Sequence, residues 1–329
     1  MFYKLLRNLL FCLDAEASHN LGLNLLNFAE KLKITKLFPK KINNPVNLLG
    51  LTFENKVGLA AGLDKNGDHI DALATLGFGF IEVGSITPRA QPGNPKPRIF
   101  RLKQHSAIIN RLGFNNKGVD HLINNLKKIK FKGILGINIG KNFDTPLEKA
   151  KDDYIYVMKK VLQYASYITI NISSPNTKGL RELQGTEYLS GLLKTLKKEQ
   201  ASFHKKENKY VPLLLKIAPD LTDDELKSMA EVFIKEKIDG IIATNTTISR
   251  EGVDSAEVGG LSGKPLFQAS TLIVEKLRKL LPDEIPIIAC GGISSKEDAA
   301  QKLKAGASLV QVYTGLIYEG PGLIRSIVK

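Results

Sequence analysis

The stretch Tyr167-Ile-Thr-Ile-Asn-Ile-Ser-Ser-Pro-Asn-Thr177 begins as an apolar, β-branched run and ends as a polar turn. Its first half is typical of a strand buried in a parallel sheet. Pro175 blocks further sheet pairing, so the chain must turn where two amides and three hydroxyls gather. One such unit alone would indicate an ordinary turn after a strand. The arrangement recurs along the chain, however, and its repetition predicts the fold.

Short apolar runs, each followed by turn residues and a helical pattern, occur eight times. They predict strands at Val57–Ala61, Phe80–Val83, Ile134–Ile139, Tyr167–Ile172, Leu213–Ile217, Gly240–Thr244, Ile287–Cys290 and Leu309–Tyr313. The helical patterns span residues 70–76, 119–128, 147–164, 187–198, 223–235, 271–281, 296–305 and 322–328. Eight alternating units predict an α/β fold, a (β/α)8 TIM barrel. An open doubly wound sheet is the alternative, but no Gly-x-Gly-x-x-Gly follows the first strand.

Two segments lie outside this repeat. Residues 1–41 are predicted to form an N-terminal amphipathic helical unit, and residues 42–329 the barrel. The long connection after strand two, Gly84–Gly133, is predicted to be an insertion over the barrel mouth. Helix starts are indicated by Asp14, by Asp220-Leu-Thr222 and by Ser294-Ser295, which supply good N-caps, and Gly306 is a suitable helix stop.

Composition favours a soluble protein with a substantial core, since 43% of the residues are hydrophobic and 24% are charged. The net charge of +14 favours contact with polyanions, but the lysines are scattered and no aromatic residues are interleaved with them. We therefore expect a solvated basic surface and no nucleic-acid partner. Five scattered histidines predict no metal site, and Cys12 and Cys290, far apart in sequence, suggest a reducing compartment.

Polar residues follow nearly every predicted strand, and in a barrel of this kind the chemistry lies at the carboxyl ends of the strands. Glycines at 291–292 after strand seven, and Thr314-Gly315 after strand eight, offer backbone N–H groups near a helix start. The stretch Gly259–Gly263 is a candidate third loop of this kind. Together they predict a phosphate-bearing ligand, the alternative being ordinary turn glycines.

The remaining polar residues indicate the chemistry of a second ligand. Ser174 has no histidine near it in sequence or at a neighbouring strand end, so proton transfer is favoured over a Ser-His-Asp relay. The ring of asparagines suits a neutral amide or imide, because a carboxamide both donates and accepts hydrogen bonds. Lys65 suits an anionic group on the same ligand.

Nearly the whole chain resembles the class 2, quinone-linked dihydroorotate dehydrogenases, the flavin enzymes of pyrimidine synthesis. The motifs that carry the resemblance are Gly58-Leu-Ala-Ala-Gly-Leu-Asp-Lys-Asn-Gly67, Thr87-Pro-Arg with Gln91-Pro-Gly-Asn94, Asn110-Arg-Leu-Gly-Phe-Asn-Asn116, Gly136-Ile-Asn-Ile-Gly-Lys-Asn142, Asn171-Ile-Ser-Ser-Pro-Asn-Thr177, Lys216-Ile-Ala-Pro-Asp220 and Ala243-Thr-Asn-Thr-Thr247. Class 1 members have Cys at the position of Ser174 and lack the N-terminal helices. Ser85 is a small departure, since Thr is more typical there and the hydroxyl is kept.

The resemblance implies two sets of ligand contacts. FMN would be held by Ala60, Ala61, Gly62, Leu63, Asp64, Ser85, Asn138, Asn171, Lys216, Thr244, Gly263, Gly292, Tyr313 and Thr314. Dihydroorotate, or its product orotate, would be held by Lys65, Asn110, Arg111, Leu112, Gly113, Phe114, Asn115, Asn171, Asn176, Asn245 and Thr246. Ser174 would be the base that removes the C5 proton, with a water or Thr177 carrying the proton away. Lys216 would stabilise the reduced, anionic flavin.

The N-terminus carries two amphipathic patterns. Apolar residues recur at helical spacing in both, at Phe2, Leu5, Leu6, Leu9, Leu10 and Leu13, and at Leu21, Leu25, Phe28, Ala29 and Leu32. Lysines at 31, 33, 36, 40 and 41 follow the second. This pattern predicts a helical pair lying on an anionic lipid surface, the alternative being a hairpin packed wholly on the barrel. The resemblance implies that a membrane quinone enters there, past His19, Arg101 and Tyr313.

These expectations place the protein on the cytoplasmic face of the cell membrane, as a peripheral protein and a monomer. The rival enzyme is a flavin barrel acting on RNA, such as a tRNA-dihydrouridine synthase. Such enzymes use a catalytic cysteine, and neither Cys12 nor Cys290 replaces Ser174. The non-enzymatic rival is a docking barrel with a decayed site, against which the full polar ring speaks.

Overall fold

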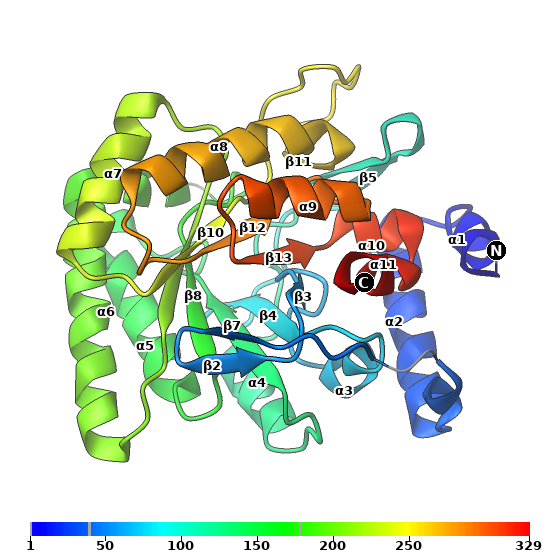
Figure 1. Cartoon of the computed structure of the whole chain (residues 1–329), viewed down its shortest axis with the longest axis horizontal. Helices are drawn as coiled ribbons and strands as arrows, with labels where there is room; N and C mark the ends of the chain where they lie inside the picture. The colour runs from blue at the N-terminus through cyan, green and yellow to red at the C-terminus, as the bar shows by residue number, and fades with distance from the viewer. Residues whose placement is uncertain (1, 39–40, 178) are drawn as a thin grey trace.

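A closed barrel of eight parallel strands forms the centre of the molecule (Figure 1). The computed structural model describes residues 2–38, 41–177 and 179–329. Each barrel strand pairs with the next one along the chain, and the last closes on the first. The eight strands are β3 (Val57–Leu59), β4 (Phe80–Ile86), β7 (Ile134–Ile139), β8 (Tyr167–Asn171), β9 (Leu213–Ile217), β10 (Gly240–Ala243), β12 (Ile287–Cys290) and β13 (Leu309–Val312). The predicted (β/α)8 fold is confirmed.

Helices cover the outside of the barrel, and all eight predicted helical segments are present. These are α3 (Ile70–Ala74), α4 (Val119–Leu126), α5 (Ala150–Val161), α6 (Thr186–Glu207), α7 (Asp223–Lys235), α8 (Phe267–Leu280), α9 (Lys296–Lys304) and α11 (Gly322–Val328). The predicted caps are also observed. Thr222 forms a capping box with Glu225, and Ser295 accepts a hydrogen bond from Asp298 N. Gly306 ends its helix with a φ of +108°.

Aromatic side chains fill the barrel interior near the amino ends of the strands. The rings of Phe53 and Phe80 meet edge to face with centroids 5.1 Å apart, and Tyr167 lies next to Phe80. Glycines make room for these rings, because a Cβ on Gly58 or Gly136 would lie 2.2 Å from Phe80 or Tyr167. Phe53 comes from a hairpin that was not predicted, formed by β1 (Val46–Leu48) and β2 (Leu51–Phe53). This hairpin packs against the interior cluster.

An antiparallel three-stranded sheet lies at the opposite end of the barrel. It contains β5 (Ile99–Leu102), β6 (Ala107–Asn110) and β11 (Gly260–Gly263). The insertion predicted after strand two supplies β5 and β6. The expectation of a loop at Gly259–Gly263 is wrong for most of that stretch, because β11 pairs with β6 along its length. Short segments complete the fold, namely η1 (Ile34–Leu37), η2 (Lys103–His105), η3 (Leu147–Lys149), η4 (Leu180–Gln184), η5 (Lys264–Leu266) and α10 (Thr314–Glu319).

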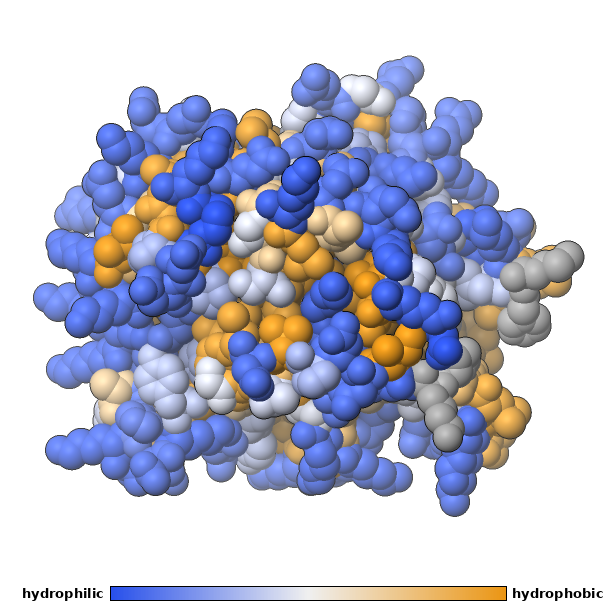
Figure 2. Space-filling view, viewed as in Figure 1, coloured by the Kyte–Doolittle hydropathy of each residue, from blue (hydrophilic) through white to orange (hydrophobic). Residues whose placement is uncertain are grey.

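Two N-terminal helices, α1 (Phe2–Leu10) and α2 (Ala15–Lys31), lie beside α10 and α11 at one side of the barrel (Figure 1). Asp14 begins α2 by accepting from Glu16 N and Ala17 N. Apolar colour gathers at the edge of Figure 2 where Figure 1 places α2. The exposed large apolar side chains of the N-terminal segment are Leu5, Leu9, Leu13, Leu21, Leu25, Phe28, Leu32, Ile34 and Leu37.

The described helices include none long and apolar enough to cross a bilayer. Helix α1 is attached to the barrel by hydrogen bonds to α10. Tyr3 Oη donates to Ile317 O at 2.8 Å, and Arg7 Nη1 donates to Tyr318 O at 2.7 Å. The side chain of Phe2 and residue Lys40, both named in the amphipathic pattern, lie outside what the structure describes.

The capping box of α7 gives a test of the fold. We expect Thr222→Ala to lower the free energy of unfolding by about 1 kcal/mol, because Glu225 N loses its acceptor. Thr195→Ala is the matched control, since Thr195 lies inside α6 and bonds only to Gly191 O of its own helix. That change should alter stability by no more than about 0.5 kcal/mol. Urea denaturation followed by circular dichroism measures both, and equal effects would contradict the capping role.

Candidate active site

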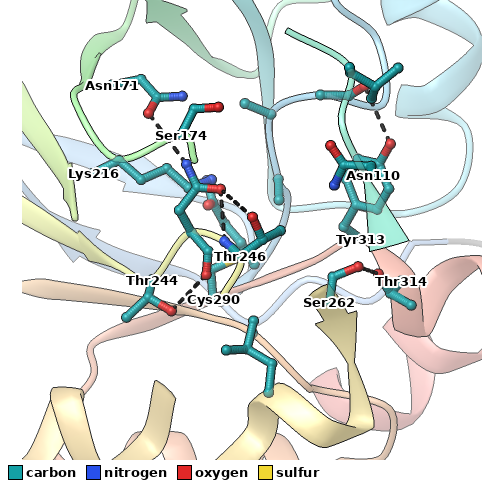
Figure 3. A pocket seen from close by; sticks show the side chains of 18 of the residues that line it. Asn110, Asn171, Ser174, Lys216, Thr244, Thr246, Ser262, Cys290, Tyr313 and Thr314 are labelled. Carbon is teal, nitrogen blue, oxygen red and sulfur yellow. Dashed lines mark hydrogen bonds between the residues drawn. The ribbon is translucent and has the colours of Figure 1, made fainter. Parts of the chain in front are cut away.

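A cavity of about 140 Å³ opens at the carboxyl ends of the barrel strands (Figure 3). Side chains from seven of the eight barrel strands or the loops after them line it, and the mouth sheet adds a wall. The structure brings most of the predicted site residues together there: Ala60, Ala61, Gly62, Lys65, Ser85, Asn110, Leu112, Gly113, Phe114, Asn171, Ser174, Asn176, Lys216, Thr244, Asn245, Thr246, Gly263, Gly292, Tyr313 and Thr314.

Five of the residues predicted to contact FMN or dihydroorotate lie outside this lining. Leu63 faces a second cavity, and Asp64 accepts from three backbone N–H groups of its own turn. Arg111 is paired with Glu257 at 2.6 Å. Asn115 has a buried Oδ1 for which the described residues offer no hydrogen-bond partner. Asn138 lies below the cavity, where it accepts a hydrogen bond from Ser85 Oγ.

Asn171 is the centre of the polar ring. It stands at the end of β8 in register with Lys216 of β9, so both side chains reach the same part of the cavity. Asn171 Nδ2 donates to Ser85 Oγ at 2.8 Å, which leaves Oδ1 to accept from Ser173 N at 3.2 Å. Asn245 Nδ2 lies 3.4 Å from the same oxygen. The orientation of the Asn171 amide is therefore set by Ser85 of β4 and by the loops that follow β8 and β10.

Ser174 lies in the loop that follows β8, buried, with its side chain in the cavity lining. Its Oγ accepts from Asn176 N at 3.3 Å. Cys290 lines the same cavity from the end of β12, on a different strand from the Ser174 loop. Burial raises the pKa of the Cys290 thiol, which therefore stays protonated. The thiol and the serine hydroxyl have separate positions in the site.

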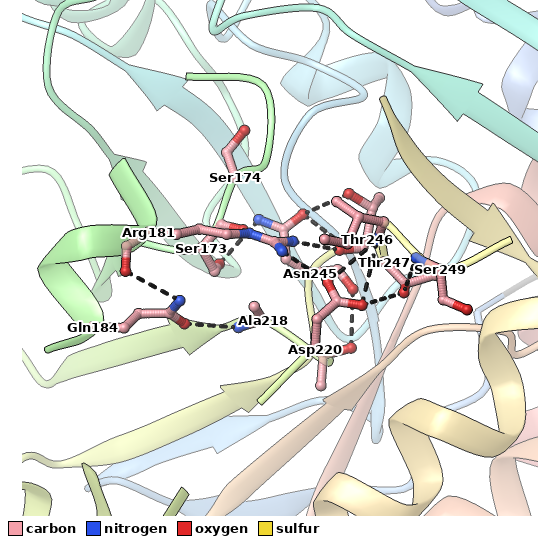
Figure 4. A network of polar contacts seen from close by, with 12 residues as sticks. Ser173, Ser174, Arg181, Gln184, Ala218, Asp220, Asn245, Thr246, Thr247 and Ser249 are labelled. Carbon is pink, nitrogen blue, oxygen red and sulfur yellow. Dashed lines mark hydrogen bonds and ion pairs between the residues drawn. The ribbon is translucent and has the colours of Figure 1, made fainter. Parts of the chain in front are cut away.

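Arg181 holds three strand-end loops together, although sequence reasoning did not identify it (Figure 4). Its guanidinium donates to Ser173 O at 3.1 Å and to Thr246 O at 3.1 Å. It also forms an ion pair with Asp220 at 2.8 Å. Asp220 in turn accepts from Thr247 Oγ1. The backbone beside Ser174 and the backbone of Thr246 are thus fixed by one partly buried cation.

Glycines and hydroxyls form the other end of the cavity. Gly292 has a φ of +76°, and a Cβ there would lie 2.4 Å from Phe267 Cα, so only glycine fits. Thr314 begins α10, and its hydroxyl lies 2.8 Å from the Ser262 hydroxyl of the mouth sheet (Figure 3). This end has the backbone and hydroxyl donors of a phosphate site.

Lys65 lines the same cavity from the loop that follows β3. Its Nζ donates to Gly62 O at 2.9 Å. Burial lowers the pKa of Lys65 to about 8, so the ammonium form is present at neutral pH and is lost as the pH rises through 8. Within the described part of the chain, no group of three His, Cys, Asp or Glu side chains is placed to hold a metal ion.

A second cavity, of about 570 Å³, lies between the N-terminal helices, β5, β6, α10 and α11. Its lining is mainly apolar and includes His19, Arg101 and Tyr313. Burial lowers the pKa of His19 to about 3, so the imidazole is neutral. Arg101 donates to Leu10 O at 3.2 Å, which ties the mouth sheet to α1. The two cavities share four lining residues: Asn110, Leu112, Ser262 and Tyr313.

Several lining residues were not identified from sequence, among them Leu266, Ile293, Gln311 and Val312. Gln311 sits inside an apolar strand and is fully buried, with Nε2 donating to Glu82 Oε2 at 2.7 Å. The signal that would have found it is alternation along β13, because Gln311 and Leu309 share the inward face.

Comparison with known proteins identifies the family. Residues 44–329 match the family model of dihydroorotate dehydrogenase. Dihydroorotate dehydrogenase (quinone) of Acinetobacter baylyi is 56% identical, over 100% of this chain and 99% of that protein. The protein of the same name from Idiomarina loihiensis is 56% identical, over 99% of each.

A solved structure agrees with the sequence relatives. The crystal structure of DHODH from Eimeria tenella in complex with ferulenol superposes with a TM-score of 0.86 at 40% identity, covering 95% of this chain and 89% of that one. The chain belongs to the dihydroorotate dehydrogenase family, in its quinone-linked class.

Proposed function

We propose that the protein oxidises dihydroorotate to orotate through bound FMN and passes the electrons to a membrane quinone, in pyrimidine (UMP) biosynthesis. The observation that carries the proposal is the meeting of two unlike cavities. One is a polar ring around Ser174, and the other is a large apolar cavity under the N-terminal helices. They share Tyr313, so a group bound at that wall can exchange electrons with ligands in both.

The residues present fit FMN. Gly292, Thr314 and Ser262 supply the donors that a phosphate requires at one end of the cavity. Lys216 and the Asn171 amide stand at the other end, where a flavin ring needs hydrogen bonds and a positive charge. When bound, FMN supplies the acceptor for the hydride. The chain's own residues hold it, orient the substrate against it and move the proton.

The substrate would lie among the asparagines. Lys65 faces its carboxylate, and Asn110, Asn176 and Asn245 pair with its imide and amide groups, for which carboxamides are suited. The Ser174 oxygen would take the proton from C5 and pass its own proton to a water or to Thr177, while the hydride from C6 would go to FMN, so that the C5–C6 single bond becomes a double bond. Arg181 keeps the Ser174 loop and Thr246 at a fixed separation during this step.

The N-terminal unit, residues 1–41, is proposed to dock the barrel, residues 42–329, on the cytoplasmic face of the cell membrane. Leu5 and Leu9 are each 64% exposed and Phe28 is 60% exposed, which is unfavourable in water and favourable in a bilayer interface. Nearby lysines favour an anionic lipid surface. We propose a peripheral monomer that binds no nucleic acid.

The first test concerns the cofactor. Heat-released ligand of the wild-type protein should have the mass of FMN, with one equivalent per chain. Gly292→Ala should lose most of it, because the new Cβ would meet Phe267 and distort the loop. Gly22→Ala is the control, since a Cβ there has nothing within 4 Å. A Gly292→Ala protein with full FMN content would contradict the assignment of this loop.

The second test concerns the base. Ser174→Ala should retain FMN but slow its anaerobic reduction by dihydroorotate about 10²-fold, as loss of a general base does. Ser173→Ala removes the neighbouring hydroxyl. Ser173 lies outside the cavity lining, and its hydroxyl donates to Asn171 Oδ1. This change should slow reduction about tenfold or less. Stopped-flow absorbance gives both rates, and near-normal reduction by Ser174→Ala would place the base elsewhere.

The third test concerns the membrane. The triple variant Leu5→Ser, Leu9→Ser, Phe28→Ser should bind anionic vesicles at least about tenfold more weakly, since each change removes about 1.5 kcal/mol or more of apolar burial. Reduction of a water-soluble quinone should remain. The control changes three exposed apolar residues on other helices, Tyr156, Tyr188 and Leu272, to Ser. Equal vesicle binding by both triple variants in a sedimentation assay would contradict the docking face.

A further inference from the structure

Arg98, in the insertion, is a buried cation held by an N-terminal helix. Its side chain is only 7% exposed, and that of its partner Glu16 in α2 is 14% exposed. Arg98 Nε donates to Glu16 Oε2 at 3.0 Å and Nη2 donates to Glu16 Oε1 at 2.7 Å. Two parallel hydrogen bonds between a planar guanidinium and a carboxylate fix direction as well as distance.

The third guanidinium nitrogen of Arg98, Nη1, binds backbone carbonyls on the side of the proposed substrate site. Nη1 donates to Pro92 O at 2.6 Å and to Asn94 O at 2.9 Å. Asn94 Nδ2 then donates to Arg111 O at 2.9 Å and to Asn176 O at 3.3 Å. The chain of contacts from Glu16 therefore reaches the loop that carries Asn176.

The loop that carries Asn176 borders the proposed substrate site. Asn176 Nδ2 donates to Asn110 Oδ1 at 3.1 Å, and both side chains line the active-site cavity. We propose that Glu16 of α2 is a positioning residue for the dihydroorotate site, acting through Arg98 and Asn94. The inference rests on the proposed function, and it assigns to a helix of the apolar cavity a role in binding at the other cavity.

Glu16 and Arg98 also influence the substrate site in a second way, because their charges change the pKa of Lys65. The negative charge of Glu16 raises the pKa of Lys65, as does Asp64, whereas burial and Arg98 lower it. His19, also beside Lys65, is neutral because burial lowers its pKa. Removing the Glu16 charge therefore lowers the pKa of Lys65 further, and the ammonium that would hold the substrate carboxylate is lost at a lower pH.

The test measures orotate binding to the full-length, FMN-loaded protein by calorimetry at pH 6.5 and pH 8.5. Glu16→Gln should raise the Kd about threefold at pH 6.5, because the Arg98 fork loses its ionic partner. The increase should be larger at pH 8.5, because less Lys65 is protonated there. Arg98→Lys keeps the positive charge but loses the two parallel hydrogen bonds to Glu16, so the increase in Kd for this variant should be similar at both pH values.

The matched control is Glu30→Gln, the same charge change on the same helix, roughly 20 Å along its axis. It should leave the Kd within about twofold of wild type at both pH values. If Glu16→Gln fails to fold, Glu16→Asp replaces it in the test. This variant should bind orotate more weakly than wild type, and the pH dependence of its Kd should be unchanged because the negative charge is kept.

The outcomes separate the inference from the function on which it rests. Wild-type binding of orotate together with an unchanged Glu16→Gln Kd, or an unchanged Glu16→Asp Kd where that variant carries the test, overturns the positioning role alone. A wild-type protein that binds no orotate at either pH contradicts the proposed function, and with it this inference. A rise in Kd that the Glu30→Gln control shares would assign the effect to helix charge and also overturn the role.

Discussion

A single buried carboxylate, Glu82, orients the polar groups on which the active site depends. It is fully buried inside the barrel and accepts from Asn138 Nδ2 at 2.9 Å, Tyr167 Oη at 2.9 Å and Gln311 Nε2 at 2.7 Å. A buried carboxylate needs this many donors, because it has left water entirely. Each donor is thereby held in one orientation.

The orientation that Glu82 gives to Asn138 determines the orientation of Asn171, through Ser85. Because Asn138 donates to Glu82, its oxygen accepts from Ser85, and the Ser85 oxygen then accepts from Asn171. Asn171 is left with its oxygen toward Ser173 and Asn245. The hydrogen-bond directions around the proposed flavin and substrate are thus set from the barrel floor, by a carboxylate that lies outside the cavity lining.

The prediction from sequence succeeded where one physical rule acts locally and failed where contacts join distant segments. Buried parallel strands are continuous apolar runs, so all eight were found, and the strand-end rule placed Lys216, Asn171 and Ser174 correctly in one cavity. Arg111 follows the same motif but turns away, because Glu257 pairs with it from far along the chain. Arg98 and Arg181 were missed for the same reason, since their partners on other elements define their roles. The hairpin ending at Phe53 and the helix α10 are too short to show periodicity.

The central claim is that one chain carries electrons from a polar cavity to an apolar one. The most direct measurement is an anaerobic titration of the purified protein with dihydroorotate, followed by its visible spectrum. The account predicts that the flavin band bleaches with about one equivalent per flavin, as a two-electron oxidation requires, and returns when a quinone is added. A flavin band that dihydroorotate leaves unchanged would contradict it.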